Sequence, residues 1–255
     1  RYPLTSGLQE FLRHGREHVR RGGHRSAPAV PARPRPEQPV AATPPPHVTS
    51  DAKGDRLSTL RRDLEGCALC SLATARWGLV PGSGAVAAPL LIIGDHCRQA
   101  REWPATILFG AEEDVMLWNM MRAIGLGPGD VYVPNTVKCC PLDEQQSLAE
   151  SERACAGYLQ REIALVQPRV ILAMGEAAAR AVLGTSEPVF RLRGRLHRGR
   201  QSDRTGTPLP VMVTFHPRYL LGQAAMKKAA WQDLQIIQRH LRMSAPTGGP
   251  GQKTT

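Results

Sequence analysis

The sequence predicts an α/β protein, a three-layer α/β/α domain on a central, mostly parallel four-stranded sheet. Strand-length apolar runs alternate with helical segments, which is the pattern of such folds. The runs are almost continuously apolar, as is typical of strands buried on both faces of a parallel sheet. Hydrophobic residues make up 42% of the chain, enough for a proper core. The expected strands cover residues 89–94, 131–135, 169–175 and 209–215.

Helical segments follow the expected strands in order. In the second of them, Leu159, Ile163 and Val166 form one apolar face, as a helix lying on a sheet requires. The expected helices cover residues 112–125, 148–167, 176–184 and 223–242.

The ends of the chain differ from this domain. Residues 1–55 are rich in proline, alanine and arginine, and we expect a disordered basic extension there. Apolar residues at helical spacing within residues 8–19, with arginines on the other side, predict a short amphipathic helix that binds either a protein partner or nucleic acid. We expect the folded domain at residues 56–242 and a second disordered tail at residues 243–255.

The chain is strongly basic, with a formal net charge of +11 over 255 residues. Such a charge favours a polyanionic partner, nucleic acid above all. No apolar run has the roughly 18 residues needed to span a bilayer. The N-terminal residues lack the apolar core of a secretory signal. We therefore expect a monomeric cytoplasmic protein, associated with the nucleoid, that binds no membrane and keeps its cysteines reduced.

Residues whose side chains can bind a ligand or take part in a reaction follow three of the four expected strands. In parallel sheets, ligands bind beyond the carboxyl ends of the strands. Asp95 and His96 follow the first strand, residues 135–139 end the second, and His216 follows the fourth. We expect a site where these ends meet.

The cysteines are spaced as ligands. Cys67 and Cys70 form a C-x2-C pair, and Cys139 and Cys155 are separated by fifteen residues. Four thiolates from three segments suit a tetrahedral zinc ion or an iron–sulfur cluster, and spacing alone does not decide between them. We expect the other two cysteines, Cys97 and Cys140, to be small buried hydrophobic side chains.

A longer pattern resembles the iron–sulfur uracil-DNA glycosylases, family 4 of that superfamily. It runs from about residue 57 to 242 and includes "CALCSLATARWGLVPGSG", "VYVPNTVKC", "LRGRLH" and "VMVTFHPRYLL". The resemblance implies a DNA repair hydrolase that flips uracil, or a related deaminated base, out of DNA and cleaves its N-glycosidic bond. It also implies a structural [4Fe-4S] cluster, with zinc as the alternative, on Cys67, Cys70, Cys139 and Cys155.

The resemblance also implies roles for individual residues. Asp95 would orient water and His216 would stabilise negative charge on the leaving base. The expected base-binding residues are Asn135, Phe109, Leu108 and His96. The expected contacts to DNA phosphates are Lys138, Arg218 and Arg193.

The first motif departs from the family pattern. Where the family has Gly-Glu-Ala-Pro-Gly, this chain has Gly94-Asp-His-Cys-Arg98, so a small-residue loop becomes bulkier. The family's stacking phenylalanine falls on Leu108, with Phe109 beside it, and Gly222 replaces an arginine that often enters the duplex. Two hypotheses remain: an active glycosylase, or a DNA-binding or repair-complex protein that kept fold and cluster but lost efficient catalysis.

Overall fold

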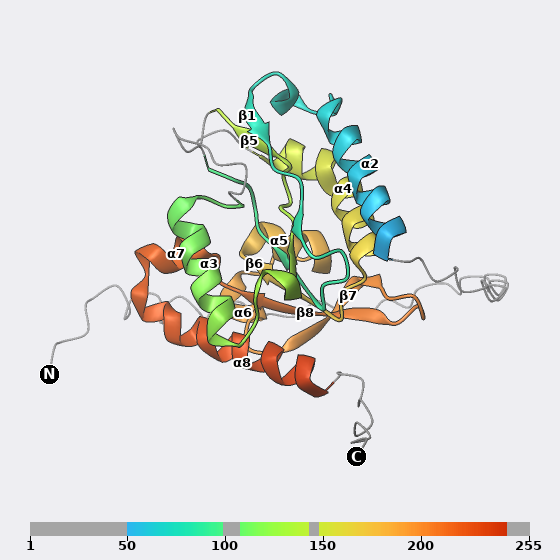
Figure 1. Cartoon of the computed structure of the whole chain (residues 1–255). Coiled ribbons are helices and arrows are strands. Elements are labelled where there is room, and N and C mark those ends of the chain that lie inside the picture. The colour runs from blue at the N-terminus through green and yellow to red at the C-terminus, as the bar shows by residue number, and fades with distance from the viewer. Residues whose placement is uncertain (1–49, 99–107, 143–147, 244–255) are drawn as a thin grey trace, which may run out of the picture. The chain divides into compact units, whose positions relative to one another are not determined.

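A central six-stranded sheet organises the described structure (Figure 1). This structure, a computed structural model, describes residues 50–98, 108–142 and 148–243. The strand order is β2-β4-β3-β6-β8-β7, and the four inner strands run parallel. The strands are β2 (Ser83–Gly84), β3 (Leu90–Ile93), β4 (Val131–Val133), β6 (Val170–Met174), β7 (Leu196–Ser202) and β8 (Pro208–Thr214).

The four inner strands confirm the parallel core that the sequence predicts, and every residue of β3, β4 and β6 is buried. The sheet nevertheless has two further strands, because β2 and β7 pair antiparallel at its edges. The strand β7 was not expected from the sequence, because most residues of LHRGRQS are polar and none of them is fully buried. An edge strand of this kind lacks the continuous apolar run from which a buried strand is predicted.

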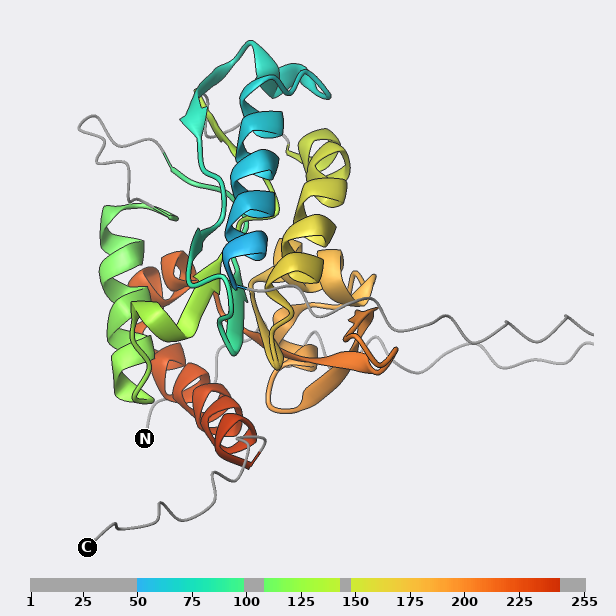
Figure 2. The ribbon, with the colours of Figure 1, turned by 45° about the vertical axis from the view of Figure 1, so that its right-hand side comes forward.

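Helices cover both faces of the sheet (Figures 1 and 2). One layer holds α2, α4 and α5, and the other holds α3 and α8, as right-handed crossovers between the parallel strands require. The bounds are α2 (Ser50–Glu65), α3 (Ala111–Ala123), α4 (Ala149–Val166), α5 (Glu176–Leu183), α6 (Val189–Leu192), α7 (Pro217–Gly222) and α8 (Lys227–Met243). Two 3-10 turns, η2 (Pro128–Asp130) and η3 (Ala224–Met226), precede β4 and α8.

The first described helix, α2, lies beside α4 (Figure 2). Its buried leucines, Leu57, Leu60 and Leu64, recur at helical spacing on one face. The Lys53 ammonium donates to a carbonyl at the C-terminus of α4, 3.2 Å away, where a cation is favourable. Residues 50–55, which we expected in the extension, thus belong to the folded domain. The amphipathic helix expected within residues 8–19 and all but the first residue of the expected tail lie outside the described residues.

A two-stranded antiparallel ribbon lies apart from the main sheet. It pairs β1 (Arg76–Leu79) with β5 (Cys139–Pro141), next to the short turn η1 (Ser71–Ala73). These elements bring the CALC segment toward β5 and α4. None of the helices in the described ranges is long and apolar enough to cross a membrane.

Candidate active site

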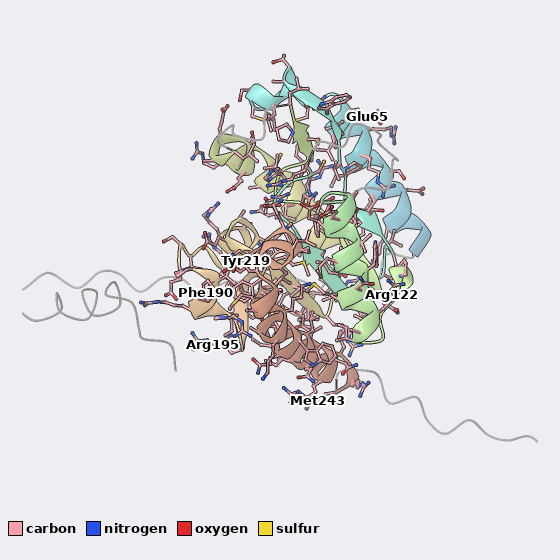
Figure 3. The ribbon with its side chains drawn as sticks, turned by 90° about the vertical axis from the view of Figure 1, so that its left-hand side faces the viewer. Glu65, Arg122, Phe190, Arg195, Tyr219 and Met243 are labelled. Carbon is pink, nitrogen blue, oxygen red and sulfur yellow. The ribbon has the colours of Figure 1, made fainter. Side chains whose placement is uncertain are left out.

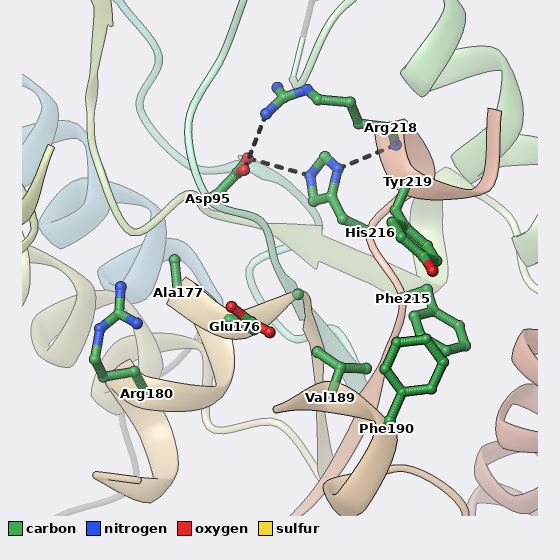
Figure 4. Close-up of a pocket in the computed structure, with 11 residues that line it drawn as sticks. Asp95, Glu176, Ala177, Arg180, Val189, Phe190, Phe215, His216, Arg218 and Tyr219 are labelled. Atoms are coloured by element: carbon green, nitrogen blue, oxygen red, sulfur yellow. Dashed lines mark hydrogen bonds and ion pairs between the residues drawn. The ribbon is translucent and has the colours of Figure 1, made fainter. Parts of the chain in front are cut away.

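A cavity of about 580 Å³ opens at the carboxyl ends of the inner strands (Figure 4). Asp95 follows β3, Gly175 follows β6 and His216 follows β8, and all three line it. Because β6 lies between β3 and β8, the glycine at its end leaves space between the two side chains on either side. Gly175 has a positive φ of 90°, which a glycine adopts without strain.

The backbone of Asp95 is fixed by the segment after β4. Its carbonyl accepts hydrogen bonds from the Val137 N–H at 2.9 Å and the Thr136 hydroxyl at 2.6 Å. The carboxylate accepts the His96 N–H on Oδ1 at 2.7 Å and the Arg218 guanidinium on Oδ2 at 3.0 Å. The carboxylate therefore faces the cavity in one orientation.

Asp95 is ionised at neutral pH. Burial alone would raise its pKa, but His216, Arg218 and His96 and the backbone hydrogen bond outweigh burial, so the pKa falls below its ordinary value of 3.8. The site thus holds a fixed negative charge.

The His216 side chain lies beside that of Asp95 at the cavity. Its Nε2 lies 3.3 Å from Asp95 Oδ1, close enough for attraction but not aligned for a hydrogen bond, and has no such partner among the described residues. Its Nδ1 accepts the Arg218 backbone N–H at 3.2 Å, so the neutral ring carries its proton on Nε2. Burial lowers the pKa of His216 to about 4, although Asp95 opposes this. A neutral imidazole therefore presents an unused N–H donor to the site.

Asn135 and Phe109 lie behind the cavity and do not line it. Asn135 pairs in strand fashion with Gly94, and its amide donates to the Leu108 carbonyl at 2.7 Å. Its Oδ1 is buried without a partner among the described residues. The Phe109 ring packs 4.9 Å from the His216 ring, and a Cβ on Gly94 would collide with Phe109 and Asn135. An unused acceptor and an aromatic face therefore lie next to the unused donor.

Of the remaining expected base-binding side chains, His96 lies within 3.6 Å of the Asp95 carboxylate and Leu108 is buried. Neither lines the cavity, whereas Arg218 does. The family's small-residue loop is thus replaced by one that Arg218 holds in place.

The three expected phosphate contacts are each engaged by a carboxylate. Arg218 binds Asp95 and, at 3.3 Å, Glu113. Lys138 is fully buried and its ammonium pairs with Glu162. Arg193 binds the buried Asp233 carboxylate at 3.1 Å. Their contacts with DNA phosphates stay a prediction.

The four expected ligand cysteines converge beside the ribbon. Cys139 and Cys155 are buried, and Cys67 and Cys70 are partly exposed. Cys139 interacts electrostatically with both Cys67 and Cys70, and Cys155 with Cys139 and Cys70. Arg76 donates to the Cys139 sulfur at 3.4 Å. No group of three or more ligand side chains in the described part of the chain is close enough to hold a single metal ion.

The other two cysteines are buried, as expected, but they also touch. The sulfurs of Cys97 and Cys140 lie 2.6 Å apart, with Val80 beside them. They join the loop after Asp95 to β5, so the loop is packed onto the ribbon that carries Cys139.

One wall of the cavity, made of aromatic side chains, was not expected from the sequence. Phe190, Phe215 and Tyr219 form it, with Glu176 and Arg180 on the rim (Figure 4). Phe215 and Tyr219 flank the "HP" of the second motif, a signal that the sequence contained. Phe190 comes from α6, a single turn of helix that no periodicity marks.

Fold and site together define a class: α/β enzymes in which a fixed carboxylate and a neutral histidine follow two parallel strands that are separated by one other strand. The chain belongs to the uracil DNA glycosylase superfamily, whose sequence model matches residues 81–235.

Curated relatives narrow the placement. The chain is 27% identical to the type-4 uracil-DNA glycosylase of Pyrobaculum aerophilum, over 71% of this chain and 92% of the relative. It is 25% identical to that of Archaeoglobus fulgidus, over 76% and 97%. The type-4 enzyme of Thermotoga maritima is 28% identical, over 61% and 78%. These identities are consistent with a divergent member of family 4.

Proposed function

We propose that this protein is a uracil-DNA glycosylase, a hydrolase that removes uracil from DNA in base excision repair. The observation that carries the proposal is the ionised Asp95 beside the neutral His216, 3.3 Å apart in one cavity of a superfamily member. The relatives are named as uracil-DNA glycosylases, which supports the same reaction. The target base would have to leave the duplex stack to reach this cavity.

His216 would stabilise the leaving base. When the bond between C1′ and the base nitrogen breaks, its electron pair goes to the uracil ring, which becomes an anion. The unused Nε2–H of His216 is a buried donor suited to an oxygen of that anion. A fixed donor of this kind typically contributes about 10²–10³ in rate.

Asp95 would act on the sugar side. Its charge favours the positive character that develops at C1′, and its oxygen can orient the water that bonds there. His96 and Arg218 hold the carboxylate in place, so little reorganisation accompanies the step.

Asn135 would read the base. Its unpartnered Oδ1 is an acceptor, and uracil presents an N–H donor at N3 where cytosine presents an acceptor. A buried acceptor left facing another acceptor is costly, so this atom favours uracil over cytosine. Phe109 is fully buried against the His216 ring, so it would stack on the extruded base only after a local rearrangement.

Cys67, Cys70, Cys139 and Cys155 would hold a [4Fe-4S] cluster. Burial first, and then the neighbouring ligand cysteines, raise the pKa of Cys139 and Cys155, which indicates that these thiols lie near one another. Thiolate ligands suit an iron–sulfur cluster as well as zinc, the resemblance to family 4 favours the cluster, and the Arg76 donor suits a negatively charged sulfur. The cluster would clamp three chain segments together; we assign it no electron transfer.

One observation favours the alternative, a DNA-binding protein with weakened catalysis. Arg218 binds Oδ2 of Asp95 while the His96 N–H binds Oδ1, so both carboxylate oxygens are engaged. A carboxylate engaged in this way attracts water less strongly.

Release of uracil from a single-uracil oligonucleotide, single- or double-stranded, tests the proposal. The native protein should release uracil, His216→Ala should lose the activity, and Asn135→Leu, which removes the acceptor, should reduce discrimination against cytosine. DNA binding by His216→Ala is the control, because a misfolded variant loses both. A folded native protein that binds the oligonucleotide without releasing base would support the alternative.

A further inference from the structure

Three aromatic rings form one continuous surface at the mouth of the cavity (Figure 4). Phe215 and Tyr219 are stacked, with centroids 5.1 Å apart and an interplanar angle of 24°. Phe190 meets Phe215 edge-on at 5.0 Å and Tyr219 at 6.3 Å. The chain has only four phenylalanines and four tyrosines, so this gathering is a concentration of scarce side chains.

The outer two rings are exposed although their positions are fixed. Phe215 is buried, with 3% of its surface accessible, and anchors the group in the core. Phe190 is 60% and Tyr219 is 40% exposed. Neither is needed to fill the interior, and their mutual contacts hold their orientation before any ligand arrives.

The surroundings of these rings include arginines. Arg180 lines the same cavity and pairs with Glu152 at 2.7 Å, and Glu176 lies on the rim. Arg191 and Arg195, by contrast, are exposed one and five residues after Phe190. Phe190, Tyr219 and Arg195 lie near one another on one side of the molecule (Figure 3). Aromatic faces with arginines around them are the combination that binds single-stranded nucleic acid, since rings stack bases and arginines contact phosphates.

We propose that Phe190 and Tyr219 form a stacking platform for the nucleobase next to the extruded one. The target base would enter the cavity that Asp95 and His216 line, and its neighbour, unstacked by the extrusion, would lie on the exposed rings. This inference rests on the proposed function. It deepens that function, because a platform for an unpaired neighbour favours single-stranded or locally opened DNA over intact duplex.

The test deletes the neighbouring base from the oligonucleotide and the Phe190 ring from the protein, first singly and then together. The probes are single-stranded oligonucleotides with one 2′-fluorinated uracil nucleotide, which resists cleavage, and with the base of the 5′ or 3′ neighbour either present or deleted. For the native protein, deletion at one of the two positions should weaken binding about fivefold or more. Phe190→Ala should weaken binding of the intact oligonucleotide as much, and should respond no further to the deletion.

Two variants serve as controls. Val115→Ala removes an equally exposed apolar side chain, 61% accessible, from α3, and should leave the dependence on the neighbouring base intact. Phe190→Trp keeps a ring and should retain the coupling. Additive losses from Phe190→Ala and the base deletion, or no loss from either, would overturn the platform.

Uracil release is measured separately on unfluorinated DNA, so the two failures are distinguishable. Release without coupling to Phe190 would overturn the platform and leave the glycosylase. Coupling without release would support the platform on a protein that binds extruded bases but does not cleave them.

Discussion

The cavity and the four-cysteine region are stabilised in different ways. Asp95 and His216 follow strands that are paired on both sides within the sheet, and backbone hydrogen bonds fix their positions. Two of the cysteines precede the short turn η1, one lies on a two-stranded ribbon with irregular register, and one lies on α4. Two of these cysteines, Cys67 and Cys70, are partly exposed.

This difference indicates which region needs a bound group. The sheet holds the cavity's side chains in orientation with its own hydrogen bonds, so catalytic geometry is a property of the fold. The cysteine region has few internal bonds and gains most from a cross-link between distant segments, which reduces the entropy of the unfolded chain. Substitutions in both regions test this contrast between the cavity and the four-cysteine region.

The largest effect should come from Cys139→Ser. Removing one ligand should abolish bound iron and the visible absorption near 400 nm, and should lower the soluble yield strongly, because the ribbon loses its cross-link. The matched control is Cys140→Ser, which changes the neighbouring thiol and should keep iron and colour. Iron per protein and the absorption spectrum are the measurements. A brown Cys139→Ser protein beside a colourless Cys140→Ser protein would show that we chose the wrong ligand.

The next effect tests the buried connection between the two regions. The Lys138 ammonium pairs with Glu162, whose carboxylate also accepts the Gly82 N–H at 2.9 Å and the Tyr132 hydroxyl at 3.3 Å. Lys138→Met leaves a buried uncompensated carboxylate and should cost about 3–5 kcal/mol of unfolding free energy.

The double variant Lys138→Met/Glu162→Leu is the comparison, measured by denaturant unfolding of the iron-loaded protein. It should lose much less than the sum of the single changes, since an apolar pair replaces an ion pair at little cost. Additive losses would mean that the two groups act independently.

The sequence predicted the parallel core well because buried strands carry long apolar runs. The residues after β3 and β8, Asp95 and His216, were also found, since parallel strands must bring their ends to one edge. These predictions depend only on local pattern and the direction of the strands.

Side-chain partners were not predictable in the same way. Lys138, Arg193 and Arg218 look like DNA contacts in a basic chain, yet each binds a carboxylate distant in sequence: Glu162, Asp233 and both Asp95 and Glu113. Such pairs depend on three-dimensional proximity that no local spacing reveals. The aromatic wall was missed for the same reason, because Phe190 meets Phe215 and Tyr219 only after folding.

A smaller effect should appear as acid sensitivity at the cavity. The pKa of His216 is about 4 in the folded state and 6.5 when unperturbed, so the unfolded chain takes up this proton first as the pH falls. The stability linked to His216 is therefore complete above pH 6.5 and is lost down to about pH 4, by roughly 3 kcal/mol in all.

The comparison is between the native protein and His216→Phe in unfolding experiments from pH 7 to 4. The variant should lose less stability over this window. In the native protein the lowered pKa of Asp95 places its own loss of stability below pH 3.8. Because His216 contributes to that lowering, the same comparison is made between Asp95→Asn and Asp95→Asn/His216→Phe. Equal losses in both proteins would mean that His216 is not buried as a neutral ring.

The smallest effect concerns Arg218, which holds the Asp95 carboxylate. Arg218→Ala should lower the rate of uracil release about tenfold, or roughly 1.4 kcal/mol, because the carboxylate loses a fixed orientation. It should also shift the acid limb of the pH–rate profile upward, since Arg218 helps to lower the pKa of Asp95. Arg218→Lys keeps the charge and should restore the position of the acid limb, but not the full rate, because an ammonium cannot bridge Asp95 and Glu113 as a guanidinium does. A faster Arg218→Ala enzyme would instead show that Arg218 restrains Asp95, and that this member of the superfamily has weakened its own catalysis through the residue after the "HP" motif.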